Sequence, residues 1–71
     1  MIFAKHGNGN GLDDLYVIPD DPVEFEKLGK IFRDRSITAV PFRDNVTGRQ
    51  SFEIGCGESL QPDIEAWMAE G

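Results

Sequence analysis

Residues 20–36 read DDPVEFEKLGKIFRDRS, and this segment carries the clearest structural signals in the chain. Asp21 is a favoured helix N-cap, Pro22 suits the first helical position, and Glu24 can complete a capping box. Apolar residues follow at helical spacing and form one stripe: Phe25, Leu28, Ile31 and Phe32. These signals predict a helix from Asp21 to Arg35 whose apolar side is buried against the rest of the domain.

Gly29 lies inside this predicted helix, at the margin of the apolar stripe. Glycine costs about 1 kcal/mol relative to alanine in a helix interior, so its presence indicates that another part of the protein packs closely there. We expect the backbone of a strand opposite Gly29.

Short runs of strand-forming residues flank the predicted helix. Two consecutive Asn-Gly pairs in residues 7–11 favour a hairpin turn between the first two runs, and the turn sequence of residues 44–48 favours a second hairpin. Pro41 has no amide hydrogen, so its strand should lie at a sheet edge or with that position facing outward. The four runs are residues 1–5, 15–18, 37–42 and 51–54.

The chain closes with a second amphipathic segment, which begins between Ser59 and Pro62 and runs to about Glu70. A helix this short is not stable alone in water, so its apolar side must pack on the protein or on a partner. The ββαββα order predicts a single α+β domain over residues 1–71. We expect an antiparallel sheet of about four strands, with the main helix on one face and the short C-terminal helix at its edge or end.

The charge balance limits the classes of partner. The net charge is -6, from 13 acidic and 7 basic residues that are dispersed along the chain. Direct nucleic-acid binding needs a basic face, which this composition does not supply. No apolar run approaches the roughly 20 residues that span a bilayer. With a single cysteine and no apolar leader, we expect a cytoplasmic protein without a membrane partner, and a homodimer through an edge strand fits such a sheet.

Cys56 is the only cysteine, and it lies between two glycines shortly before the closing helix. A nearby helix N-terminus can lower a thiol pKa, but nucleophilic catalysis also needs a base, and His6 is the only histidine. The acids Glu58 and Asp63 act in the opposite direction and raise a thiol pKa. A small thiol-dependent enzyme that uses Cys56 with His6 is therefore an alternative, and it requires the first and last strands to be neighbours.

Metal binding has weaker support in the sequence. Residues 8–15 resemble one unit of the calcium-binding nonapeptide of parallel β-helix toxins, but one copy supplies only part of a coordination sphere. A single cysteine and a single histidine also cannot form a structural zinc site without two carboxylates. We therefore expect a glycine-rich turn, no metal site and no cofactor.

The remaining hypothesis is a surface that combines acidic charge with an aromatic anchor. It predicts a non-enzymatic protein-binding module, such as a phage or mobile-element inhibitor or a regulatory subunit, that engages a basic surface of a partner protein. A structural subunit that joins a larger assembly through its strand edges is a further alternative. Trp67 and Met68 could also be ordinary core residues and not an anchor. The predicted partner-binding residues are Asp13, Asp14, Glu58, Asp63, Glu65, Trp67, Met68 and Glu70.

Overall fold

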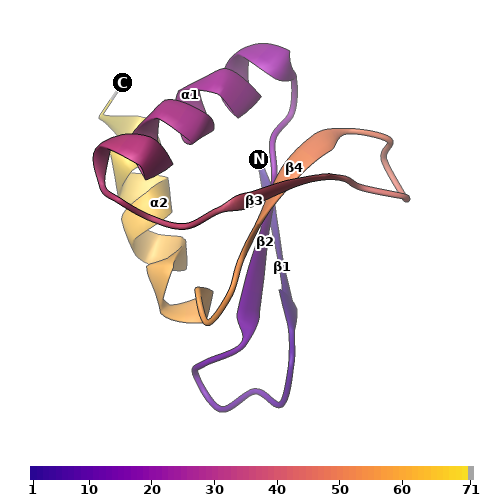
Figure 1. The fold of residues 1–71 in the computed structure, drawn as a ribbon, viewed down its shortest axis with the longest axis vertical. Helices are drawn as coiled ribbons and strands as arrows, with labels where there is room; N and C mark the ends of the chain where they lie inside the picture. Colours follow the sequence, from indigo (N-terminus) through magenta and orange to yellow (C-terminus); the bar gives the residue numbers. More distant parts are fainter. Residues whose placement is uncertain (71) are drawn as a thin grey trace.

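The computed structural model describes residues 1–70, and it contains a four-stranded antiparallel sheet with both helices packed on the same side (Figure 1). A single turn of 3-10 helix, Glu58–Leu60, precedes the last helix. The predicted α+β class and ββαββα order are confirmed. The strands are β1 (Ile2–His6), β2 (Asp14–Ile18), β3 (Val40–Arg43) and β4 (Gln50–Ile54), and the helices are α1 (Pro22–Asp34) and α2 (Gln61–Ala69).

The strand order in the sheet is β1-β2-β4-β3. Each hairpin therefore contributes one central strand and one edge strand, and the two hairpins join through the β2–β4 pair, in which Leu15 is opposite Ile54 and Val17 is opposite Phe52. The strand that contains Pro41 is an edge strand, as its missing amide hydrogen predicts.

The start of α1 has the predicted N-cap, Asp21, but the returning hydrogen bond to Glu24 comes from the residue before it. The Asp21 carboxylate accepts a hydrogen bond from the Glu24 amide at 2.8 Å. In return, the Glu24 carboxylate accepts from the amide of Asp20 at 2.9 Å, where a standard capping box would use the amide of Asp21. The first of these bonds satisfies an amide of the first helical turn that has no intrahelical partner, and the second fixes the residue before the cap.

The core lies between the sheet and the two helices. Phe52 is at its centre, with the Phe25 ring stacked at a centroid distance of 4.5 Å and the Phe32 ring edge-on at 5.2 Å. A Cβ added at Gly29 would lie 3.5 Å from the Phe52 ring, so the expectation of a strand backbone opposite this glycine is wrong. The close neighbour is an aromatic ring that needs room under α1. The buried core residues are Leu15, Val17, Leu28, Phe32, Phe52, Ile54 and Ile64.

Candidate functional site

Three of the predicted binding acids lie together where the β1–β2 turn meets the loop after β4. The buried Asp13 carboxylate accepts from the Gly9 amide, with both oxygens within 3.0 Å. The Glu58 carboxylate accepts from the Asp13 amide at 3.2 Å, and the Asp14 carboxylate accepts from the Cys56 amide at 3.1 Å. These acids hold two distant segments together, so much of their hydrogen-bonding capacity is already used inside the protein.

The predicted acids of α2 are exposed but lie on two flanks of the helix. Ile64 is fully buried and marks the side of α2 that faces the core. At about 100° per residue, Glu65 is on one side of Ile64, while Asp63 and Glu70 are on the other. The three carboxylates therefore do not form one continuous acidic face.

Trp67 and Met68 are half-buried, and both contribute to the contact between α2 and α1. The Arg35 guanidinium lies 4.4 Å from the centroid of the Trp67 ring, a cation–π contact. The Lys27 ammonium donates to the Met68 carbonyl at 3.1 Å. Both residues thus help to join the two helices, which leaves only part of each side chain accessible.

A second surface, which we term the open sheet face, lies on the side of the sheet away from the core. The strand register alternates side chains between the two faces, and it places exposed apolar residues on this side. Ile2 is 48% exposed and Val40 is 56% exposed. The register also places Ile18 and Ser51 on this side, but both are buried. The open sheet face is formed by the accessible residues of this side, Ile2, Ala4, His6, Asp14, Tyr16, Val40, Phe42 and Glu53.

Tyr16 is at the centre of the open sheet face and joins its aromatic residues. The Tyr16 ring is 5.5 Å from the Phe42 ring and 6.5 Å from His6, measured between centroids. Glu53 is directly opposite Tyr16 on the neighbouring strand. Partial desolvation raises the pKa of the Tyr16 phenol above its ordinary value, and the negative charges of Glu53 and Asp14 raise it further. An aromatic cluster and a negative potential therefore coincide on this face.

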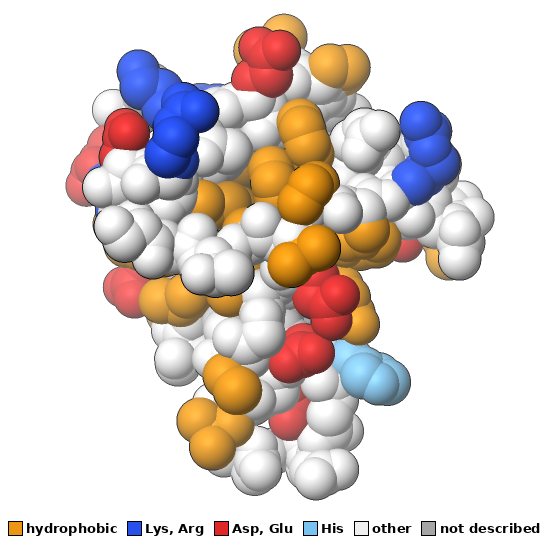
Figure 2. Space-filling model, in the orientation of Figure 1, with side chains coloured by type: hydrophobic (Ala, Val, Ile, Leu, Met, Phe, Trp, Pro, Cys, Tyr) orange, Lys and Arg blue, Asp and Glu red, His pale blue; other side chains and the backbone are white. Residues whose placement is uncertain are grey.

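The same combination of side chains is visible on the molecular surface. Figure 2 shows hydrophobic side chains gathered at the centre of the view, with acidic side chains directly below them and beside the histidine. Of the predicted binding residues, only Asp14 belongs to the open sheet face. The other residues of this face were not predicted. The alternation of side chains along residues 14–18 was the signal that could have found them, because it directs Tyr16 to the side of the sheet opposite Leu15 and Val17.

The charge around Tyr16 can be measured directly. Replacing Glu53 with glutamine is expected to move the pKa of Tyr16 down toward the ordinary value of about 10, because a nearby negative charge is removed. Since the folded-state pKa is raised, neutral Tyr16 favours folding, and this contribution is lost as the pH rises through that pKa. Alkaline titration of the phenolate absorbance checks the shift. Glu65→Gln on α2 is the control, and an equal shift in both variants would contradict a local effect of Glu53.

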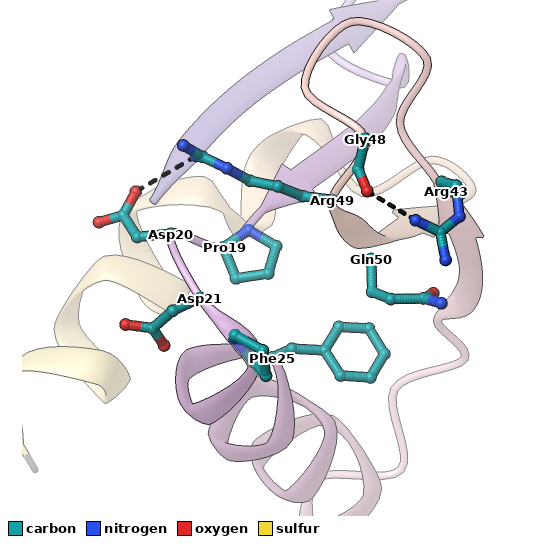
Figure 3. Close-up of a pocket in the computed structure, with 9 residues that line it drawn as sticks. Pro19, Asp20, Asp21, Phe25, Arg43, Gly48, Arg49 and Gln50 are labelled. Atoms are coloured by element: carbon teal, nitrogen blue, oxygen red, sulfur yellow. Dashed lines mark hydrogen bonds and ion pairs between the residues drawn. The ribbon is translucent and has the colours of Figure 1, made fainter.

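A pocket of about 320 Å³ lies between the start of α1 and the β3–β4 hairpin (Figure 3). We term it the Pro19 pocket. Pro19 and Phe25 contribute apolar surface, while Arg49 extends across Pro19 toward Asp20 (Figure 3). Its lining residues are Pro19, Asp20, Asp21, Pro22, Phe25, Arg43, Gly48, Arg49 and Gln50.

The alternative of a thiol enzyme required β1 and β4 to be adjacent. The strand order places β2 between them, so the sheet does not meet this condition. His6 pairs with Asp14 across the β1–β2 ladder, and Cys56 is exposed in the turn after β4 with a φ of 54°. The main-chain contact of Cys56 is to the Asp14 carboxylate, which anchors the turn.

Within residues 1–70, no helix is long and apolar enough to cross a membrane. The same residues contain no group of three or more His, Cys, Asp or Glu side chains placed to hold a metal ion. Comparisons with protein-family models, curated proteins and solved structures found no match.

Proposed function

We propose that this protein is a small, non-enzymatic acidic module that binds a basic surface of another protein through the open sheet face. The observation that carries the proposal is the position of Tyr16, whose ring lies among exposed apolar side chains and beside Glu53 and Asp14. Aromatic side chains next to carboxylates suit lysine and arginine, because the ring attracts the cation and the carboxylate pairs with it.

The net charge of -6 supports the same class of partner, since it steers a basic protein toward this one during diffusion. Exposed Ile2 and Val40 supply apolar area on opposite edges of the face. Burial of such area gives binding energy, and the carboxylates give selectivity for cationic groups. A module of this kind covers the basic surface of its partner, which is how a small inhibitor or regulatory subunit acts.

The test compares two charge reversals of the same type at different places. We expect Glu53→Lys to weaken binding of the basic partner at least about tenfold, a change of about 1.4 kcal/mol. Glu65→Lys alters the net charge equally but lies on α2, so it should change the affinity far less. The partner is first captured at low salt with the unchanged protein, and the dissociation constants are then measured with purified components at several salt concentrations.

Two outcomes would argue against this function. Equal weakening by Glu53→Lys and Glu65→Lys would show that only the net charge matters and would remove the open sheet face as the binding site. Affinity that does not change with salt would remove charge complementarity altogether. Size-exclusion chromatography of the isolated chain tests the alternative role as a subunit of an assembly, because it shows whether the chain forms a stable oligomer. An oligomer that buries Tyr16 would use the open sheet face for its own contacts and would compete with a partner.

A further inference from the structure

We propose that the Pro19 pocket binds a carboxylate that carries an apolar group, and that this site is separate from the open sheet face. The two sites share no residue. The volume of about 320 Å³ falls at the small end of the range for ligand pockets, so it fits one ring or branched chain with its acid group.

The apolar part of the pocket is rigid. Pro19 is buried at the end of β2, and Pro22 occupies the first turn of α1. Phe25 is fixed by its stacking on Phe52, at 4.5 Å between ring centroids. Pro19 is fully buried and supports the pocket from beneath. Because Pro22 and Phe25 have few accessible rotamers, a ligand ring can pack on them with little loss of side-chain entropy.

The β3–β4 hairpin contributes two guanidinium groups to the opposite wall. Arg43 donates to the Gly48 carbonyl at 2.8 Å and forms no ion pair within residues 1–70. Arg49 approaches the Asp20 carboxylate only to 3.7 Å. Both guanidinium groups therefore keep N–H donors for an anion, but the charge of Arg49 is shared with Asp20, and of the two only Arg43 is without a carboxylate partner in residues 1–70.

The acids at the other end of the pocket are already occupied. Asp20 pairs with the N-terminal ammonium of Met1 at 2.8 Å, closer than its distance to Arg49. Asp21 accepts from the Glu24 amide as the cap of α1. The ammonium also pairs with Glu24 at 3.4 Å, so the charge of Asp20 is offset by the ammonium and Arg49 together. The charge of Asp21 is offset by the positive end of the helix dipole. The carboxylate of a ligand would lie at the arginine wall, with its apolar group toward Pro22 and Phe25.

A free aromatic or aliphatic acid and the last residue of a peptide present the same chemistry. Titration of the ¹⁵N-labelled protein with phenylacetate, and separately with a short peptide ending in phenylalanine, distinguishes the two sources by their relative affinities. Each probe has a neutral control of nearly equal shape, phenylacetamide or the amidated peptide. We expect the acids to shift amide signals of residues 20–25 and 43–50, and the amides to bind at least about tenfold more weakly.

Substitutions localise the site. Arg49→Gln should weaken the acid at least about tenfold and leave the weak binding of the amide unchanged, whereas Arg33→Gln on the outer side of α1 should have no effect. No amide shifts at millimolar probe, or equal affinity for acid and amide, would overturn the proposal. The acid–amide comparison uses the unchanged chain, so it decides the question even if Arg49→Gln disturbs the hairpin. Binding of a basic partner by the open sheet face would be unaffected by either result.

Discussion

Replacing Phe52 with alanine is expected to lower the free energy of unfolding by about 3–5 kcal/mol, the largest effect of the substitutions considered. Phe52 belongs to a central strand and is 7% exposed. The Phe25 ring stacks on it and the Phe32 ring meets it edge-on, so truncation removes two aromatic contacts as well as buried area. The cavity would lie directly under α1, where Gly29 leaves no side chain to fill it.

A loss of this size is large compared with the total free energy of unfolding expected for so short a chain. Domains are stable by roughly 0.05–0.15 kcal/mol per residue, which gives about 4–10 kcal/mol here. We therefore expect Phe52→Ala to lose a large share of its stability and to unfold at a much lower urea concentration, as measured by circular dichroism. Val46→Ala is the control, because Val46 is 92% exposed and its loss should cost less than about 0.5 kcal/mol. A cost below about 1 kcal/mol at Phe52 would show that the three rings are not a rigid unit.

The position of α1 could be predicted from the sequence because its signals are local. The Asp21 cap, Pro22 in the first turn and the spacing of apolar residues lie within a few residues of one another, and each has a direct physical meaning. The boundary was correct to within one residue at each end. The two hairpins could also be expected, since Asn-Gly pairs and the turn sequence of residues 44–48 favour turns. The first turn is nevertheless a longer loop, residues 7–13, than the two-residue turn that Asn-Gly favours.

The strand order could not be predicted, and the open sheet face depends on it. The β2–β4 pair joins Tyr16 to Glu53 across 37 residues of chain, a contact that neither hairpin specifies alone. Without that pair, Tyr16 and Phe42 are two unrelated half-buried residues. The face appears only when the register of both hairpins is combined, which is why the predicted binding residues include only one member of it, Asp14.

The acidic residues show a related limit of sequence reasoning. Acids outnumber basic residues in the composition, but nothing in it separates a carboxylate that caps a turn from one that is free for a partner. Asp13 is only 8% exposed and accepts from the Gly9 amide, while Glu58 reaches it from 45 residues away. Such long-range hydrogen bonds have no periodic signal. The charge of the chain therefore suggests a class of partner, but it does not identify the carboxylates that are free to contact one.

Gly55 and Gly57 provide the second large expected effect, because they flank Cys56 and look equivalent in the sequence. A Cβ added at Gly57 would lie 2.6 Å from Cγ2 of Ile54, 2.8 Å from its Cβ and 3.0 Å from its carbonyl oxygen. Ile54 is 3% exposed and faces the core, so it cannot move away freely. A Cβ at Gly55 would meet only the Asp14 carboxylate, at 3.9 Å.

We therefore expect Gly57→Ala to lower the free energy of unfolding by about 1–3 kcal/mol, and Gly55→Ala to change it by less than about 0.5 kcal/mol. The φ of Gly57 is -94°, which alanine adopts readily, so the cost would come from the clash and not from backbone strain. Thermal unfolding followed by circular dichroism gives the comparison, and the fluorescence of Trp67 reports whether α2 shifts with the turn that precedes it. Equal stability of the two variants would show that the turn after β4 can open to accommodate a Cβ at Gly57 at little cost in free energy. That result would also weaken the anchoring role assigned to Asp14, whose carboxylate holds the Cys56 amide between the two glycines.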